Sequence, residues 1–349
     1  MRANTKIESR INEAVSEGRC FAAADHNTKQ ILQRRREQLH LVEPIRGIYF
    51  PADLWEQLTP PQRIIHMARG ISQVRPHLVF TSQTAAILHG FELSYQAIDG
   101  KLHVATEAPV RHAFPGLCFE RTPEITPQII DGMQVVPAAH TATFCCLTLP
   151  FRYALQVIDS ALRSGVSPES IAQSCNAWKR DCSRVTKMLM LADPNSENGG
   201  ESLFRALLLE LGFARPLTQV VLIGPTSGQI YRVDFLYITP NGKLVIIEFN
   251  GMAKYSDTSM LNGQSLQQKV GAQMLREEDL KAMGATVINA SWNTLRKPQA
   301  LKSTLLEAGV PLSRTPLSWL RTGFDLEQAR KTDYSIAAQA NISGNSFAA

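Results

Sequence analysis

Two acidic residues in the second half of the chain have the spacing of a divalent-metal site. The tripeptide Pro240-Asn241-Gly242 lies between two strand patterns, Tyr231–Ile238 and Lys243–Phe249, and therefore predicts a hairpin. A three-residue loop gives a register in which Asp234 lies opposite Glu248. Directly opposed side chains have Cβ atoms about 4.5–5.5 Å apart, so two carboxylates there repel each other unless a cation neutralises them. We therefore predict a divalent cation with oxygen ligands at this place.

Further residues extend the predicted site. Asn250 shares a face with Glu248, because strand side chains repeat every two residues. Glu201 begins a predicted helix, Glu201–Leu211, and would add a third carboxylate. The helix dipole alone also favours an acidic residue in a first turn, and we weigh these two interpretations of Glu201 equally. The opposite face of the strands is expected to enter the core through Val233, Phe235, Val245 and Ile247.

The positions of histidine and cysteine restrict which metal this site can hold. All eight histidines and all six cysteines lie upstream of residue 183. The second half of the chain therefore offers no nitrogen or sulfur side-chain ligand for zinc, and an ion held by oxygen alone is magnesium or calcium. No cysteine pair has C-x-x-C spacing, which argues against the common zinc motifs and a disulfide scaffold.

The elements that must position these residues form a multidomain chain of α+β or α/β class. A length of 349 residues predicts two or three domains, and 44% hydrophobic residues are enough for real cores. Residues 1–55 have the element order of a winged helix-turn-helix, three short helices and a hairpin: Ile7–Ser16, Phe21–Ala24, Thr28–His40 capped by Asn27, Leu41–Ile45 and Ile48–Phe50.

The rest of the chain divides into three parts. Residues 60–193 read as a middle α+β domain without a visible chemical constellation, ending in a helix from Pro168 to Leu191. A linker rich in turn formers, residues 192–200, precedes a domain over residues 201–312 with the order α-β-β-β-α-β. Residues 313–349 are polar, and we expect a largely disordered tail.

Basic residues of the N-terminal domain are candidates for contact with nucleic acid. The run Arg34-Arg35-Arg36 lies on a predicted helix, and Arg46 lies at the turn of the predicted hairpin. The net charge of the chain, +5, permits an anionic partner without requiring one. A solvated helix face and an ordinary turn arginine remain the alternatives for these four residues.

The stretch from Glu201 to Trp292 resembles the PD-(D/E)xK nuclease-like domain, in its very-short-patch-repair-endonuclease-like branch. The resemblance is carried by Glu201, Gln219, Arg232-Val233-Asp234-Phe235, Glu248-Phe249-Asn250-Gly251, Lys254-Tyr255, Arg276-Glu277-Glu278-Asp279-Leu280 and Ser291-Trp292. It implies a restriction-endonuclease-like domain in which Glu201, Asp234 and Glu248 hold Mg²⁺. The metal would activate water for attack on a phosphodiester, with Lys254 as a further catalytic residue and Asn250 as a further metal ligand.

Most of residues 20–293 also resembles the AbiEi-type antitoxins of type IV toxin–antitoxin systems. Arg46-Gly47-Ile48-Tyr49 is similar to the wing of that family, and residues 158–165 are similar to a helix end of its middle segment. The resemblance implies a DNA-binding transcriptional regulator, with duplex DNA as partner and a cognate toxin as a second candidate partner.

Departures from the nuclease pattern predict weakened or lost catalysis. Asn250 stands where the family commonly has Asp, which removes one charge from the site. Gln273 and Met274 stand where the family often has Glu-Lys, which leaves Lys254, Lys269 or Arg276 as a substitute cation. Three hypotheses therefore stay open: a DNA-binding regulator, an active Mg²⁺-dependent endonuclease, and a protein-interaction scaffold.

The expected location is the cytoplasm. No apolar run reaches the ~18–20 residues that a membrane span needs, and residues 1–18 lack the apolar core of a signal peptide. We therefore expect no membrane partner and six reduced cysteines.

Overall fold

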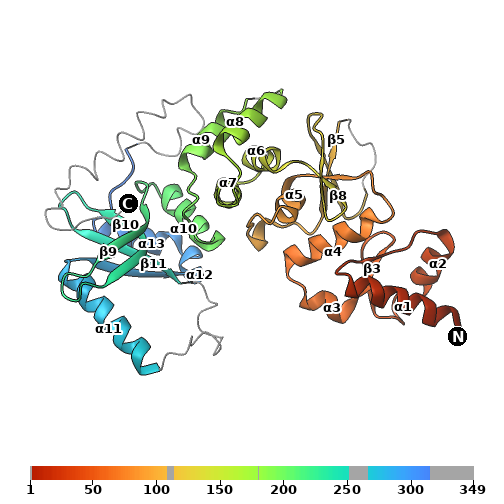
Figure 1. Cartoon of the computed structure of the whole chain (residues 1–349), viewed down its shortest axis with the longest axis horizontal. Coiled ribbons are helices and arrows are strands. Elements are labelled where there is room, and N and C mark those ends of the chain that lie inside the picture. The colour runs from red at the N-terminus through yellow and green to blue at the C-terminus, as the bar shows by residue number, and fades with distance from the viewer. Residues whose placement is uncertain (1, 108–113, 180, 251–265, 315–349) are drawn as a thin grey trace. The chain divides into compact units, whose positions relative to one another are not determined.

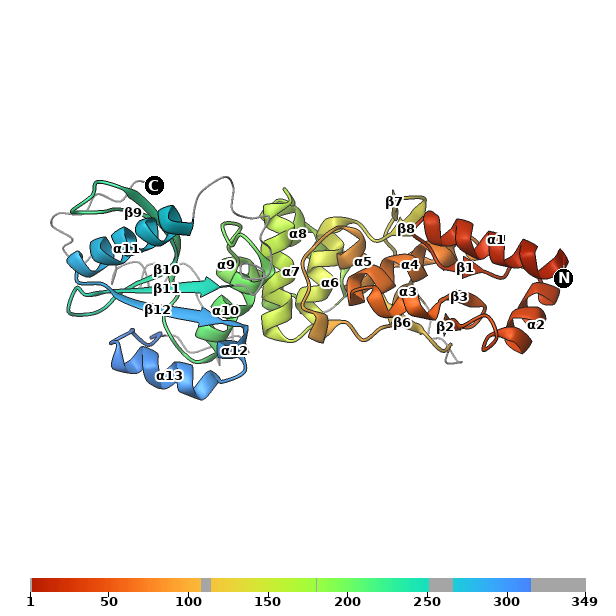
Figure 2. The same cartoon turned by 90° about the horizontal axis from the view of Figure 1, so that it is seen from below.

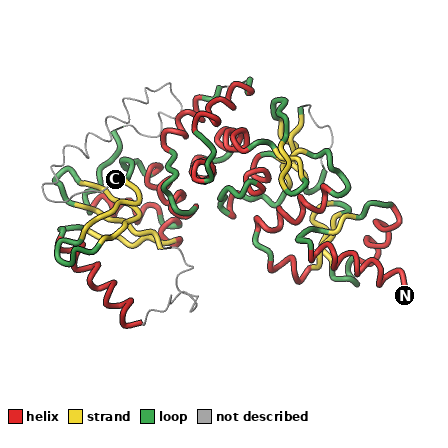
Figure 3. The backbone as a smooth tube through the Cα atoms, viewed as in Figure 1, coloured by secondary structure: helices red, strands yellow, loops and turns green. Residues whose placement is uncertain are grey.

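The computed structural model describes residues 2–107, 114–179, 181–250 and 266–314, and it has mixed α+β architecture with three sheets (Figures 1 and 3). The chain divides between Leu189 and Met190 into two compact units, which are considered separately. Lys254 and residues 315–349 of the predicted tail lie outside the described residues. Within the described part, every helix is too short or too polar to span a lipid bilayer.

The first unit begins with two helices and a small sheet. The elements are α1 (Arg2–Ser16), β1 (Phe21–Ala22), α2 (His26–Arg35), β2 (Leu41–Ile45) and β3 (Ile48–Pro51), with strand order β1-β3-β2. The predicted hairpin is confirmed. The predicted helix over Phe21–Ala24 is wrong, because Phe21 pairs with Tyr49 of β3 and so belongs to a strand. The predicted Asn27 cap is also wrong: the Asp25 carboxylate accepts the Thr28 N–H at 2.7 Å.

A five-stranded sheet follows in the same unit, with the order β6-β5-β4-β8-β7. Its strands are β4 (Val79–Phe80), β5 (Leu102–Thr106), β6 (Leu117–Arg121), β7 (Gln128–Ile130) and β8 (Met133–Val135). The helices are α3 (Ala52–Gln57), α4 (Pro60–Ser72), α5 (Ser82–Leu88), α6 (Ala138–Thr148), α7 (Phe151–Arg163), α8 (Pro168–Ser174) and α9 (Ser183–Leu191), with short 3-10 turns at Tyr95–Ala97 and Cys175–Ala177. The single helix predicted from Pro168 to Leu191 is wrong, because the 3-10 turn Cys175–Ala177 and the residues after it separate α8 from α9.

One hydrophobic core joins the two sheets of the first unit. Phe50 of β3, Met67 of α4 and Phe80 of β4 belong to the same cluster of buried side chains. This cluster crosses the stretch between residues 55 and 60, where the sequence predicts a domain boundary. Burial is therefore continuous across that stretch.

The second unit consists of α10 (Gly199–Glu210), β9 (Leu217–Ile223), β10 (Ile230–Ile238), β11 (Leu244–Asn250), α11 (Leu266–Ala282), β12 (Thr286–Ser291), α12 (Trp292–Leu295) and α13 (Pro298–Glu307). It has the predicted element order as far as β12, and two helices that were not predicted, α12 and α13, follow it. The strand order is β12-β11-β10-β9, with β11 and β12 parallel and the other pairs antiparallel. The parallel pair requires a crossover, which contains α11.

Side-chain alternation gives this sheet two buried faces. Phe235 and Ile247 pack with Phe204 of α10 on one face. Leu236 and Ile246 pack with Leu280 of α11 on the other. Figure 2 shows α11 and α13 on opposite sides of β11 and β12. Strands buried on both faces read as nearly continuous apolar runs, which is the pattern of β11.

The register of the β10–β11 hairpin is the predicted one. The recorded pairs run from Phe235 opposite Ile247 to Ile238 opposite Leu244, and the Thr239 N–H donates to the Lys243 carbonyl at 2.9 Å. Gly242 has φ +76°, the left-handed conformation that the three-residue loop needs.

A buried carboxylate fastens the β9–β10 loop to α11. Asp279 is fully buried and accepts from the N–H groups of Thr226 and Ser227, from the Ser227 hydroxyl, and from the Tyr231 hydroxyl at 2.7 Å. These donors, with the Ser227 hydroxyl first, lower the pKa of Asp279 to about 2. A Cβ on Gly224 would lie 2.3 Å from an Asp279 carboxylate oxygen, so only glycine leaves room for this contact.

Candidate functional site

The strands β10 and β11 part at Asp234. The last recorded pair is Phe235 with Ile247, and one step further the Asp234 carboxylate accepts the Phe249 N–H at 2.8 Å. A side-chain oxygen thus takes the hydrogen bond that a strand carbonyl would otherwise accept. The alternation also breaks here: Val233, expected on the face of Phe235, packs instead with Leu236, so that part of the prediction is wrong.

Glu201 lies beside Asp234 and is joined to it by Gln219. Glu201 is 4% exposed and accepts from the Glu197 N–H at 2.8 Å and from the Asn198 amide at 2.7 Å. The Gln219 amide nitrogen lies 3.0 Å from Glu201 and 3.4 Å from Asp234. Burial and the Asp234 charge raise the pKa of Glu201 against the opposing effect of its N–H donors. Two of the predicted acidic residues therefore share one neutral donor.

Gln219 itself is held in an unusual way. Its φ is +50°, in the left-handed region that non-glycine residues seldom occupy. Its side-chain oxygen is buried and has no hydrogen-bond partner among the described residues. A buried acceptor without a donor costs free energy, so this oxygen is an unsatisfied polar group next to the two carboxylates that Gln219 joins.

Glu248 and Asn250 have different partners. Glu248 forms an ion pair with Arg276 of α11, and Arg276 also donates to the Arg232 carbonyl at 3.2 Å. The Asn250 amide lies 3.4 Å from the Asn289 side-chain oxygen on β12. The predicted third and fourth ligands are therefore engaged by groups of the protein itself.

These residues fit a hard cation by type, because Glu201, Asp234, Glu248 and Asn250 offer only oxygen ligands. Among the residues that the structure describes, Glu201, Asp234 and Glu248 do not form a group with all ligand atoms within 4.8 Å of one another. The structure brings Glu201 and Asp234 together through Gln219 and pairs Glu248 with Arg276.

A second constellation, absent from the sequence predictions, lies in the first unit. His103, Cys118 and Glu120 offer a nitrogen, a sulfur and an oxygen that all lie within 4.8 Å of one another. They come from the parallel strands β5 and β6, in which His103 lies beside Cys118 and Ala105 beside Glu120. Residues two apart on a strand share a face, so Glu120 joins Cys118 there.

Hydrogen bonds hold the His103 ring between two carboxylates. Its Nδ1 lies 3.0 Å from Glu120 and its Nε2 lies 3.2 Å from Asp99, while the Cys118 sulfur lies 3.7 Å from the same Glu120 oxygen. Burial opposes the charged imidazole, but Glu120 and Asp99 outweigh it and raise the pKa of His103. The hydrogen bond from His103 lowers the pKa of Glu120.

The predicted nucleic-acid contacts lie around one carboxylate. Arg34, Arg36 and Arg46 are exposed, and Arg35 is partly buried in the last turn of α2. Glu43 on β2 accepts the Gly47 N–H at 2.8 Å and lies 3.7 Å from the Arg36 guanidinium. Glu43 thereby connects the end of α2 with the β2–β3 turn that carries Arg46.

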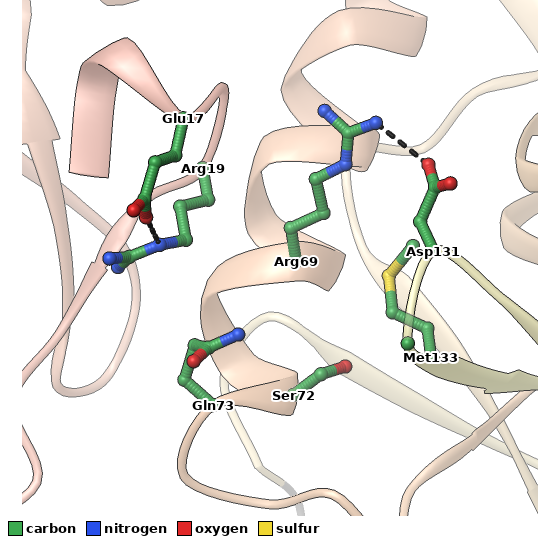
Figure 4. Close-up of a pocket in the computed structure, with 8 residues that line it drawn as sticks. Glu17, Arg19, Arg69, Ser72, Gln73, Asp131 and Met133 are labelled. Atoms are coloured by element: carbon green, nitrogen blue, oxygen red, sulfur yellow. Dashed lines mark hydrogen bonds and ion pairs between the residues drawn. The ribbon is translucent and has the colours of Figure 1, made fainter. Parts of the chain in front are cut away.

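A hollow of about 580 Å³ in the first unit also contains arginines, but both are neutralised (Figure 4). Arg19 pairs with Glu17 at 2.5 Å, and Arg69 pairs with Asp131 at 2.8 Å. These pairs satisfy the cations within the protein.

Comparisons with models of known protein families, with curated proteins and with solved structures find no match for this chain.

Proposed function

We propose that this chain is a DNA-binding regulator of the AbiEi antitoxin type, in which a winged-helix-like N-terminal part contacts duplex DNA and the second unit is a nuclease-like domain that has lost its catalysis. A cognate toxin belongs to the same proposal as a partner. The observation that carries the DNA-binding part is the junction made by Glu43.

Basic side chains from separate segments lie near this junction, the place where Glu43 contacts Arg36 and Gly47. Arg36 at the end of α2 and Arg46 on the turn are both exposed, and both are close enough to Tyr49 to lower its pKa against the stronger effect of burial. The Lys29 side chain lies 3.4 Å from the position that a Cβ on Gly47 would occupy. Three basic side chains thus lie around one turn, the arrangement that contacts to a phosphate backbone require.

The sheet order supports the winged-helix part of the proposal. A helix precedes β1, and the hairpin β2–β3 completes a sheet of order β1-β3-β2, which supports reading this hairpin as the wing. Two helices, α1 and α2, precede the hairpin, whereas the sequence predicted three, because the segment predicted as the second helix is the strand β1.

The second unit supports a nuclease-like fold with a weakened metal site. The order α10-β9-β10-β11-α11-β12 and the parallel β11–β12 pair are those expected for the restriction-endonuclease-like domain. Arg276 forms an ion pair with Glu248, and Asn250 stands where the nuclease-like family commonly has Asp. Both features reduce the negative charge that a divalent cation needs.

The test of DNA binding is its salt dependence. Each phosphate contact contributes about −0.9 to the slope of log affinity against log salt, so Arg36→Ala with Arg46→Ala should weaken binding to any duplex and make the slope less steep by about 2. Arg121→Ala, an exposed change on β6, should leave the slope unchanged. Salt-independent binding, or equal loss in the control, would contradict the proposal.

The alternative is a Mg²⁺-dependent DNA endonuclease, favoured by Gln219, whose amide nitrogen lies beside Glu201 and Asp234 and whose side-chain oxygen has no partner among the described residues. When bound, Mg²⁺ would supply an activated water for attack on a phosphodiester. Glu201, Asp234, Glu248 and Asn250 would hold it. This function predicts Mg²⁺-dependent plasmid nicking by the wild type that Asp234→Ala and Glu248→Ala abolish. If the wild type nicks plasmid DNA with none of the divalent metals tested, the endonuclease alternative is excluded and the regulator proposal stands.

A further inference from the structure

We propose that His103, Cys118 and Glu120 form a binding site for one zinc-type divalent cation, with Asp99 as a positioning residue for the histidine. This site lies in the first unit and is independent of the proposed DNA contacts and of the carboxylates of the second unit.

The distances between the ligand atoms are close to those of a metal site. Zinc bonds of about 2.0–2.3 Å in tetrahedral directions place ligand atoms roughly 3.3–3.7 Å apart. The Glu120 oxygen lies 3.0 Å from the His103 Nδ1 and 3.7 Å from the Cys118 sulfur. The remaining pair, the His103 nitrogen and the Cys118 sulfur, lies within 4.8 Å, so the three ligand atoms surround one point.

The ligand types select the metal. Imidazole nitrogen and thiolate sulfur are preferred by zinc and its neighbours in the transition series, whereas Mg²⁺ prefers oxygen alone. A neutral imidazole, a thiolate and a carboxylate carry two negative charges together, which balance a divalent ion. Three protein ligands leave a fourth tetrahedral position for water.

Asp99 has the place of an outer carboxylate. Its oxygen lies 3.2 Å from the His103 Nε2, the nitrogen that faces away from Cys118 and Glu120. A histidine that binds metal usually donates its second N–H to such a group, which fixes the tautomer and the ring orientation. The backbone N–H of His103 donates to the Thr84 hydroxyl at 2.8 Å, so both the backbone and the ring of His103 are held by hydrogen bonds.

A cysteine nucleophile explains the same residues less well. A reactive thiol needs a lowered pKa, but burial and the Glu120 charge raise the pKa of Cys118. A cation removes this obstacle, because it replaces the proton on sulfur. The access route is the carboxylate side, since the Glu120 and Asp99 side chains are 28% and 39% exposed while that of His103 is 6% exposed.

Binding must release protons. In the metal-free protein the contact between Nδ1 and Glu120 requires a proton on Nδ1, and Cys118 carries a proton on sulfur. The cation displaces both, and they leave to solvent.

The test is a Co²⁺ titration of the full chain after treatment with a chelator. The wild type should bind one equivalent and show a near-ultraviolet thiolate-to-cobalt band, which Zn²⁺ abolishes and excess Mg²⁺ leaves unchanged. Cys118→Ser should lose the band, and Cys175→Ser, a change at another partly exposed cysteine, should keep it.

A second variant, Asp99→Asn, keeps the test decisive if Cys118→Ser fails to fold. It keeps all three ligands and replaces an exposed residue, and it should weaken Co²⁺ binding by about 10–100-fold while the band persists. A wild type without the thiolate band, or a band that survives in Cys118→Ser, would overturn the site. Unchanged affinity in Asp99→Asn would overturn the positioning role.

Discussion

His103 and Arg276 each neutralise carboxylates at a candidate cation site, one in each unit of the molecule. His103 lies between Glu120 and Asp99, and Arg276 pairs with Glu248. An imidazolium can lose its proton and become a metal ligand, whereas a guanidinium keeps its charge and has no lone pair to offer. The first site can therefore exchange a proton for a metal ion in place, while the second can accept one beside Glu248 only if Arg276 moves away.

The largest expected effect separates the two sites by metal. Zn²⁺ at a hundred times its Kd should stabilise the first unit by about 2.7 kcal/mol, because it binds the folded state alone. The same excess of Mg²⁺ should leave that unfolding transition unchanged. Thermal unfolding with each metal checks this, and Cys118→Ser serves as the control. Stabilisation by Mg²⁺ that depends on Cys118 would remove the distinction.

The next effect tests the parting of β10 and β11. Asp234→Ala should lower the free energy of unfolding of the second unit by about 1–3 kcal/mol, because the buried Phe249 N–H loses its acceptor. Asp234→Asn keeps an oxygen at that place and should cost less than half as much. Urea unfolding of both variants measures the difference. Equal losses would mean that the charge of Asp234, and not its hydrogen bond, holds the strands.

A smaller effect should follow from removing the arginine. Arg276→Gln removes the guanidinium that pairs with Glu248, so Mg²⁺ at ten times its Kd should stabilise the variant by about 1.4 kcal/mol and the wild type by less. Glu278→Ala, an exposed change on the same helix, should behave as the wild type does. A wild type that responds to Mg²⁺ as strongly as Arg276→Gln would show that Arg276 does not compete with the metal.

The smallest effects are two pH dependences. Glu201 has a pKa raised above its ordinary 4.5, so the folded second unit binds the extra proton and its stability falls as the pH rises through that window. Glu201→Gln should flatten this slope; the charged groups that act on Glu201 are Asp234 and Glu197. One group changes the free energy of unfolding by at most about 1.4 kcal/mol per pH unit.

The histidine acts in a different window. The pKa of His103 is raised above 6.5 by Glu120 and Asp99 against the effect of burial. Its contribution to the first unit is therefore complete below pH 6.5 and is lost as the pH rises through the raised pKa. Urea midpoints of the two units against pH, with His103→Gln as the control, measure both slopes. A midpoint of the first unit that rises with pH in this window would contradict the assignment.

The β10–β11 hairpin could be predicted because its information is local. Pro240-Asn241-Gly242 sets the loop, the loop sets the register, and the observed pairs follow it. The break at Asp234 could not be predicted in this way. It depends on a side chain replacing a backbone acceptor, and strand alternation carries no signal for that substitution.

The trio of the first unit was missed for a different reason. Cys118 and Glu120 alternate correctly on one strand, but His103 joins them only through the parallel pairing of β5 with β6. Parallel pairing is not set by a short turn, so spacing along the chain gives no register. The two-residue strand β1 is similar: only its pairing with β3 distinguishes Phe21 and Ala22 from the start of a helix.

The contact between Gly224 and Asp279 has a consequence for related sequences. The carboxylate occupies the volume that any larger residue at position 224 would need. A larger residue at position 224 should therefore be tolerated only where position 279 carries a smaller side chain than Asp, so across homologues an Asp at 279 should occur together with Gly at 224, although 224 belongs to a loop and 279 to a helix.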